Sequence, residues 1–119
     1  MRLLIVDDSS IMRRTIEKNL SGYDIEIIGH AGNGIEALDI VTKYNPDVIT
    51  LDITMPKMNG IECLDKIMKI NPAIKVIIIT ALNDKLTGLM ALEKGAKGFL
   101  FKPVKPEPLL RAFEKLIQL

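Results

Sequence analysis

Carboxylate, hydroxyl and ammonium side chains stand at the ends of four apolar segments of this sequence. RLLIV runs into Asp7 and Asp8, and DVITL runs into Asp52. KVIII and GFLF are followed in the same way by Thr80 and Lys102. The three carboxylates and the lysine sum to −2, from −3 and +1, and such a cluster is unfavourable unless a cation joins it. A divalent ion such as Mg²⁺, which prefers oxygen ligands, would bring the formal charge to zero.

This set of residue types is suited to phosphoryl transfer. A metal ion and Lys102 would neutralise charge on phosphoryl oxygens, and Thr80 would donate a hydrogen bond to one of them. The carboxylate of Asp52 would be the nucleophile, giving an aspartyl phosphate. The alternative is that these residues are helix caps and surface ion pairs, with Asp8 helping to cap the following helix. That alternative does not explain why all five side chains follow buried segments.

The apolar segments that carry these residues are typical of parallel strands buried on both faces. They read RLLIV, DVITL, KVIII and GFLF, with a fifth and more mixed segment, IEIIG, at residues 25–29. None alternates cleanly between apolar and polar residues, as a half-exposed strand would. His30 follows the fifth segment, and we expect it in a loop.

Amphipathic stripes between these segments predict five helices that cover the sheet. The residues expected to face the core are Met12, Ile16 and Leu20; Ile35, Leu38 and Val41; Ile61, Leu64, Ile67 and Met68; Leu86, Leu89 and Met90; and Leu109, Leu110, Phe113, Leu116 and Ile117. Ser9 or Ser10 is expected to cap the first helix, and Asn59 and Gly60 to mark the start of the third. Gly88 weakens the fourth stripe.

The alternation of strands and helices predicts an α/β fold, a doubly wound five-stranded parallel sheet with five helices. One domain over residues 1–119 is expected from the length. In open sheets of this kind the functional crevice lies beyond the carboxyl ends of the strands. The polar residues at the strand ends should therefore converge on one edge.

Composition excludes several classes of function. The net charge is +1 without a basic stripe, which argues against nucleic-acid binding. No apolar run is long enough for membrane insertion, and Asp7 and Asp8 interrupt any signal-peptide core. Cys63 is the single cysteine, so no internal disulfide can form, and a cytoplasmic location is predicted. We expect Cys63 to be a partly buried small apolar residue rather than a nucleophile.

The motifs at these strand ends resemble those of the receiver domains of two-component response regulators. LIVDD, ITLDITMPKMNG, IIITA and FKPV occur in the order and spacing of that family, over nearly the whole chain. The stretch DDSSIMRRTI is similar to the single-domain chemotaxis regulators of the CheY type. The resemblance implies a flavodoxin-like (βα)5 receiver fold with strand order 2-1-3-4-5. It also implies a cis peptide bond between Lys102 and Pro103.

The resemblance also implies a role for each site residue. Asp52 would be the phosphoacceptor, Lys102 the phosphate partner, Thr80 the switch hydroxyl and Phe99 the switch aromatic. The implied ligands of Mg²⁺, for which Mn²⁺ can substitute, are Asp7, Asp8, Asp52 and the backbone carbonyl of Thr54. Such a domain assists its own phosphorylation and dephosphorylation but is not a turnover enzyme.

The partners implied by the resemblance are proteins. A phosphohistidine on a histidine kinase would be the phosphodonor, and a downstream target, with the flagellar motor switch as one candidate, would read the signal. The signalling surface would be the face made by the fourth helix, the fifth strand and the fifth helix, toward which Phe99 and Phe101 should point. A monomer is expected, with phosphorylation-linked dimerisation as the alternative.

Three residues depart from the pattern of the chemotaxis regulators. Phe99 lacks the hydroxyl of the tyrosine that is common there, and His30 stands where an acid is usual. Leu82 is apolar where polar residues are frequent. Thr54 and Leu82 are expected to border the approach of the hydrolytic water, so an apolar Leu82 predicts slow loss of the phosphoryl group. The alternative is that Leu82 merely leads into the fourth helix.

Three other functions are weighed against this one. A phosphatase of the haloacid dehalogenase type needs a second acid two residues after its aspartate, where this chain has Thr54. A flavodoxin-like electron carrier needs a hydroxyl-rich, glycine-containing loop after the first strand, and DDSS would repel a flavin phosphate. A receiver fold used only for docking would not need the complete set of acids and lysine.

Overall fold

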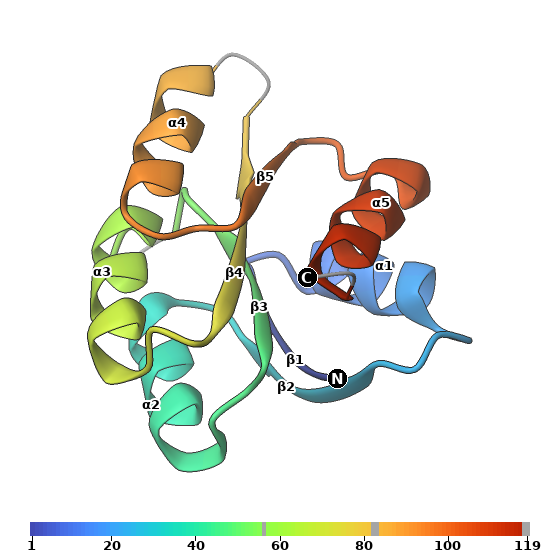
Figure 1. Cartoon of the computed structure of the whole chain (residues 1–119), viewed down its shortest axis with the longest axis horizontal. Helices are drawn as coiled ribbons and strands as arrows, with labels where there is room; N and C mark the ends of the chain where they lie inside the picture. Colours follow the sequence, from blue (N-terminus) through green and yellow to red (C-terminus); the bar gives the residue numbers. More distant parts are fainter. Residues whose placement is uncertain (56, 82–83, 118–119) are drawn as a thin grey trace.

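The computed structural model of the chain describes residues 1–55, 57–81 and 84–117, in which five strands alternate with five helices (Figure 1). The strands are β1 (Arg2–Val6), β2 (Glu26–Ala31), β3 (Val48–Asp52), β4 (Lys75–Thr80) and β5 (Gly98–Phe101). The helices are α1 (Ser10–Leu20), α2 (Gly34–Tyr44), α3 (Gly60–Ile70), α4 (Lys85–Glu93) and α5 (Pro106–Ile117). The sheet order is β2-β1-β3-β4-β5 and every neighbouring pair is parallel. The predicted fold class and strand order are confirmed.

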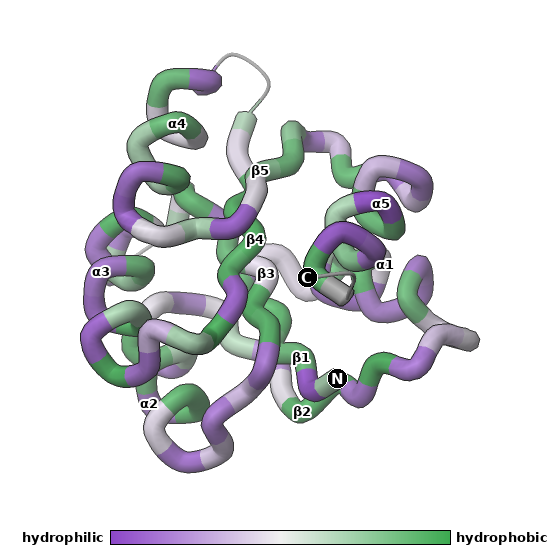
Figure 2. The backbone as a smooth tube through the Cα atoms, in the orientation of Figure 1, coloured by the Kyte–Doolittle hydropathy of each residue, from purple (hydrophilic) through white to green (hydrophobic). Residues whose placement is uncertain are grey.

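The sheet separates two hydrophobic cores. Helices α2, α3 and α4 cover one face, and α1 and α5 cover the other (Figure 1). Alternate residues of β1 serve the two cores: Leu4 and Val6 belong to the first, and Leu3 and Ile5 to the second. Figure 2 shows hydrophobic residues gathered on the central strands. Burying each such side chain stabilises the fold by about 1.5–3 kcal/mol, so the inner strands are firm supports for the residues at their ends.

Four helices begin at side chains that accept a hydrogen bond from the backbone amide three residues further on. The pairs are Ser9 with Met12, Asn33 with Glu36, Asn59 with Glu62 and Asp84 with Thr87. The predicted cap at Ser9 and the predicted start of α3 after Asn59 are confirmed. Each cap fixes the residue at which the chain turns from a strand-end loop into a helix.

The prediction that His30 lies in a loop is wrong. β2 extends two residues beyond the predicted segment, and His30 pairs with Ile5 of β1. The extension follows from β1, whose apolar run continues to Val6 and pairs with Ala31. His30 Nε2 lies 2.7 Å from Glu17 Oε1 of α1, so the polar ring finds a partner at the edge of the sheet.

The predicted core face of α4 is also wrong. Leu86, Leu89 and Met90 are 71%, 44% and 43% exposed, whereas Gly88 and Ala91 are buried. A Cβ atom on Gly88 would lie 2.9 Å from Cδ2 of Phe99. The helix therefore approaches β5 closely through its smallest residues, while Leu86, Leu89 and Met90 point outward and Leu92 packs against the core.

In α2, Ile35 was likewise expected to face the core but is 57% exposed. Ala37 and Val41 of that helix are buried in its place, while Leu38 packs at the margin of the core. The face of α2 that packs on the sheet therefore includes Ala37 and Val41 but not Ile35.

The structure also describes the peptide bond before Pro103 and the surroundings of Cys63. The Lys102–Pro103 peptide bond is cis, as the resemblance implied. Cys63 is fully buried, and burial raises the pKa of its thiol to about 11, which suits an inert apolar role. Among the described residues, no helix is long and apolar enough to cross a membrane.

The middle of β3 supplies a test of core packing. Thr50 pairs with Ile5 and Ile77 of the neighbouring strands and is 0% exposed. Within residues 1–55, 57–81 and 84–117, its Oγ1 has no hydrogen-bond partner. Thr50→Val replaces this hydroxyl with a methyl group of similar size, so we expect the free energy of unfolding to rise by about 1 kcal/mol. Urea denaturation measures it. Thr50→Ser, which keeps the hydroxyl and loses the methyl group, should lower stability. A less stable valine variant would show that the hydroxyl is satisfied.

Candidate functional site

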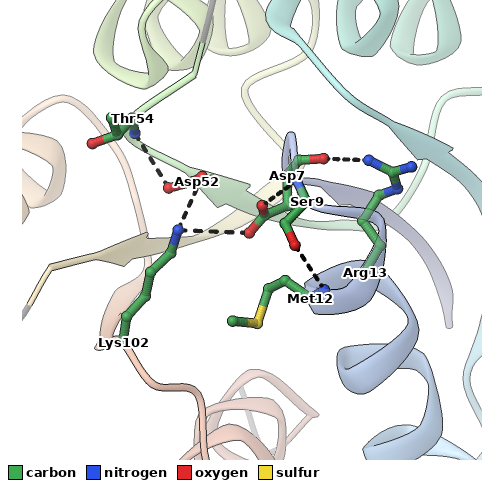
Figure 3. A network of polar contacts seen from close by, with 7 residues as sticks. All are labelled: Asp7, Ser9, Met12, Arg13, Asp52, Thr54 and Lys102. Atoms are coloured by element: carbon green, nitrogen blue, oxygen red, sulfur yellow. Dashed lines mark hydrogen bonds and ion pairs between the residues drawn. The ribbon is translucent and has the colours of Figure 1, made fainter.

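The strand ends bring the predicted residues to one edge of the sheet. Asp7 and Asp8 follow β1, and Asp52 is the last residue of β3. Thr80 is the last residue of β4, and Lys102 follows β5. Because all the strands are parallel, these four ends lie at the same edge of the sheet, and Figure 3 shows Asp7, Asp52 and Lys102 meeting there. The expected convergence on one edge is confirmed.

Asp52 is only 1% exposed and is held at both carboxylate oxygens. Oδ1 accepts a hydrogen bond from the Thr54 amide at 3.2 Å, and Oδ2 accepts one from Lys102 Nζ at 3.1 Å (Figure 3). Gly60 allows this placement, because a Cβ atom there would lie 2.5 Å from Ile53 Cα and 2.7 Å from the Asp52 carbonyl oxygen. The start of α3 therefore packs directly against the backbone that carries Asp52.

Asp7 is 0% exposed and has one free oxygen. Its Oδ1 accepts a hydrogen bond from the Ser9 amide at 2.9 Å. Its Oδ2 has no hydrogen-bond partner among the residues that the structure describes, and it lies 3.9 Å from Lys102 Nζ. A buried carboxylate oxygen without a partner is costly, and it is an unused ligand atom facing the site.

Asp8, in contrast, is exposed. One carboxylate oxygen from each of Asp7, Asp8 and Asp52 lies within 4.8 Å of the other two. Hard oxygen ligands at this spacing, one of them unpartnered, fit a divalent cation such as Mg²⁺. The type and spacing of these ligand atoms therefore suit the Mg²⁺ ion that the sequence predicts.

Burial dominates the electrostatics of the two inner acids. It raises the pKa of Asp7 above the ordinary value, against the opposing effects of the Ser9 amide and the Lys102 charge. The pKa of Asp52 is raised first by burial and then by the charge of Asp7, while Lys102 opposes the shift. The charge of one lysine thus offsets only part of the cost of burying two carboxylates. A bound cation would offset the rest of that cost.

Thr80, Phe99 and Thr54 differ in their burial and in what they contact. Thr80 is 2% exposed, and its hydroxyl donates a long hydrogen bond of 3.5 Å to the Asp84 carbonyl. Phe99 is half-buried, and its ring meets Phe101 edge-to-face with centroids 5.4 Å apart. The side chain of Thr54 is exposed. Leu82 lies outside the described residues, so its predicted effect on hydrolysis stays a prediction.

Arg13 is a site neighbour that the sequence analysis did not identify. Its Nη1 donates a hydrogen bond to the Asp7 carbonyl oxygen at 2.6 Å (Figure 3). The available signal was positional: with Ser9 as the cap, Arg13 stands in the first turn of α1 and can reach back over the loop that precedes the helix. An arginine on an amphipathic helix looks like ordinary surface charge until the fold places that loop.

Comparisons with known proteins agree with this geometry. The profile of the response regulator receiver domain matches residues 3–114. The chemotaxis protein CheY of Listeria monocytogenes is 42% identical over 115 residues, covering 97% of both chains. CheY of Thermotoga maritima is 39% identical, covering 97% of this chain and 96% of its own. The CheX–CheY–BeF3–Mg²⁺ complex from Borrelia burgdorferi matches with a TM-score of 0.93 and 36% identity, over 98% of this chain and 89% of that one.

The chain therefore belongs to the response regulator receiver domain family. It is a phosphoacceptor signalling domain of the two-component type, with homologues among the CheY chemotaxis proteins. The acidic pocket at the strand ends is the place where a domain of this class can hold a metal ion.

The raised pKa values predict how stability depends on pH in a chelator. The folded protein keeps protons on Asp7 and Asp52 at pH values where the unfolded chain has lost them. The stability from these protons is complete below the ordinary value of 3.8 and is lost as pH rises through the raised values. Asp52→Asn should therefore be more stable than wild type in chelator at pH 7, with a margin that shrinks as pH falls.

Chemical denaturation between pH 4 and pH 7, in roughly one-unit steps, measures this margin. Asp39→Asn is the control, because Asp39 is an exposed acid paired with Lys43 on α2. A margin at Asp52 that is absent or reversed at pH 7 would show that the buried charge is already compensated.

Proposed function

We propose that Asp52 accepts a phosphoryl group from a phosphohistidine of a partner histidine kinase, in a reaction that requires Mg²⁺. The observation that carries this proposal is the ion pair between Asp52 Oδ2 and Lys102 Nζ, 3.1 Å long, beside the unpartnered Oδ2 of Asp7. It supplies a buried nucleophilic carboxylate, a fixed positive charge and a free ligand atom at one strand edge.

The proposed ligands of Mg²⁺ are Asp7, Asp8, Asp52 and the backbone carbonyl of Thr54, and Mn²⁺ would be accepted by the same oxygens. The mutual 4.8 Å spacing of the three carboxylates supports this set. When bound, the ion supplies positive charge for the phosphoryl oxygens. The chain itself supplies the position of the acids, because Asp7 and Asp52 end strands that are buried on both faces.

The transfer forms one bond and breaks one. An oxygen of Asp52 attacks phosphorus, and the P–N bond of the phosphohistidine breaks with its electron pair returning to the ring nitrogen. Lys102, which donates a hydrogen bond to Asp52 Oδ2 in this structure, would turn to a phosphoryl oxygen and balance the negative charge of that oxygen. No proton has to leave Asp52, provided that the carboxyl is ionised, and the cation that relieves its burial favours that form.

Thr80 connects the phosphoryl group to α4. Its hydroxyl at present donates to the carbonyl of Asp84, the residue that caps α4. Turning the hydroxyl to a phosphoryl oxygen would break that contact, which at 3.5 Å is already weak. Phe99 lies against Gly88 of the same helix, so both proposed switch residues contact or adjoin α4. We therefore propose that phosphorylation alters the face made by α4, β5 and α5.

The target of this face is proposed to belong to a chemotaxis pathway, with the flagellar motor switch as one candidate. The support is the similarity of the whole matched region to CheY proteins. The exposed Leu86, Leu89 and Met90 on α4 give the face apolar contact surface that a protein partner could cover.

Several wider features stay predictions. They are that residues 1–119 form one receiver domain, that the domain does not turn over substrate, that it is a monomer unless phosphorylation drives dimerisation, and that it is cytoplasmic. The docking-only alternative is disfavoured because the acids and Lys102 are assembled. The phosphatase alternative lacks its second acid, since Thr54 stands at that position.

Phosphorylation by a small donor tests the proposal. With acetyl phosphate and Mg²⁺, intact mass measurement should show one added phosphoryl group on wild type, and peptide mapping should find none at position 52 of Asp52→Asn. Excess chelator should abolish the gain, because without a cation the site repels an anionic donor. Asp39→Asn, on the outer surface of α2, should label as wild type does. Efficient labelling in chelator would contradict the metal-dependent mechanism.

The contact between Gly88 and Phe99 gives a second test. Gly88→Ala should gain about 1 kcal/mol of helix propensity, yet its Cβ atom would press on the ring of Phe99 from 2.9 Å. Because overpacking costs roughly 1–3 kcal/mol, we expect the variant to be about 1 kcal/mol less stable than wild type.

In the background Phe99→Leu, the same Gly88→Ala change should be neutral or stabilising. Thermal or urea denaturation of the four proteins of this double-mutant cycle gives the coupling energy. Equal effects in both backgrounds would mean that α4 and Phe99 are not in mechanical contact.

A further inference from the structure

The metal site proposed above uses two neighbouring acids that are held very differently. Asp7 is buried, its amide donates to the Ala31 carbonyl at 3.0 Å, and its Oδ1 is bonded to the Ser9 amide. Asp8 is exposed, and within the described part of the chain no donor is bonded to its carboxylate. With no donor on the side chain, the backbone that carries Asp8 decides which positions its carboxylate can reach.

That backbone is fixed at both ends. On one side, the Asp7 amide is tied to β2. On the other, Ser9 is tied to α1, because its Oγ accepts from the Met12 amide at 3.2 Å and its carbonyl accepts from the Arg13 amide at 3.1 Å. Between these anchors lies the peptide group that joins Asp7 to Asp8. Its carbonyl oxygen accepts the 2.6 Å hydrogen bond from Arg13 Nη1 (Figure 3).

The arginine is itself held in place. Arg13 is half-buried, and its Nε is buried without a hydrogen-bond partner in the described part of the chain. Its Nη1 lies over the loop between β2 and α2, 3.5 Å from where a Cβ atom on Gly32 would be. Burial of the unsatisfied Nε is unfavourable, whereas the 2.6 Å hydrogen bond from Nη1 to the Asp7 carbonyl oxygen favours this pose. Arg14 shows the contrast: it is exposed, and its hydrogen bonds within the described residues run to Ser10 of its own helix, at 3.4 and 3.5 Å.

We propose that Arg13 is a positioning residue of the metal site, whose hydrogen bond to the Asp7 carbonyl orients the Asp7–Asp8 peptide and with it the Asp8 carboxylate toward the cation. The proposal rests on the proposed function, because it needs a divalent ion at Asp7, Asp8 and Asp52. A partner that orients a metal ligand typically changes metal affinity when it is removed, even though it does not touch the metal.

The proposal and a plain charge effect predict opposite signs. Arg13 is a cation close to a site that binds a cation, so as a charge alone it weakens binding, and removing it should tighten binding. As a positioning residue it strengthens binding, and removing it should weaken binding. Arg13→Met removes the charge and the donors but keeps an unbranched apolar stem. Arg13→Lys keeps the charge and changes the reach and geometry of the donor.

The experiment is titration of the whole chain with Mn²⁺, with free ion followed by its electron paramagnetic resonance signal and folding checked by circular dichroism. Arg13→Met should raise the dissociation constant about tenfold, the lower end of what loss of such a partner costs. Arg13→Lys should raise it less. Arg14→Met, the matched control on the adjacent residue, should bind as wild type does. At saturating Mn²⁺, phosphorylation of Arg13→Met by acetyl phosphate should recover to near the wild-type rate.

The outcomes distinguish an error in the metal site from an error in the role of Arg13. If wild type binds no Mn²⁺, or if Asp52→Asn binds it equally well, the proposed metal site itself is wrong. If wild type binds but Arg13→Met binds equally or more tightly, only the positioning role is overturned. Should Arg13→Met fail to fold, Arg13→Lys decides the question: weaker binding than wild type supports the role, and unchanged binding refutes it.

Discussion

Two carboxylates held out of water at the ends of adjacent strands are the constraint on which the rest of the structure depends. Asp7 and Asp52 are 0% and 1% exposed, and burial raises the pKa of both. Lys102 lies 3.1 Å from one and 3.9 Å from the other, so it compensates them only in part. An arrangement of this kind is unfavourable in isolation. It becomes useful when a cation and a phosphoryl group arrive, since each then finds charges already in place.

The fold makes this arrangement tolerable by burying so much apolar surface behind it. Residues of β1 and β3 alternate between the two cores, and the acids sit where those cores end. Two glycines allow helices to approach the sheet closely. Gly60 lets α3 begin against the backbone of Asp52, and Gly88 lets α4 lie against Phe99. Connection between the site and the outer face of α4 is therefore short, running through Thr80, the cap at Asp84 and the helix itself.

The fold and the inner site could be predicted because they rest on patterns local to the chain. Buried parallel strands appear as unbroken apolar runs, and their ends identify the residues that share an edge. The failed predictions depend on contacts outside the segment concerned. Leu86 and Ile35 looked like core residues, but how a helix is rotated on a sheet depends on how closely it can approach, and in α4 that is decided by Gly88 against a ring of β5. The strand position of His30 cannot be predicted from its own segment, because it depends on pairing with β1.

Arg13 illustrates the same limit at the site. Its side chain acts on a carbonyl oxygen, and backbone acceptors leave no trace in residue type or spacing. Sequence patterns find the acids that would bind the metal because carboxylates are chemically distinctive. They do not find the groups that hold the intervening backbone, which only the three-dimensional path of the loop reveals.

A crystal structure of the chain grown with Mg²⁺ and beryllofluoride would test most directly whether the strand-end carboxylates form a phosphoacceptor site. The expected result is beryllofluoride bonded to Asp52, a metal ion in contact with the three acids, Lys102 Nζ turned from Asp52 to a fluoride, and the Thr80 hydroxyl turned away from the Asp84 carbonyl. Beryllofluoride bound elsewhere, or a bound complex in which Lys102 and Thr80 keep their present partners, would contradict the mechanism.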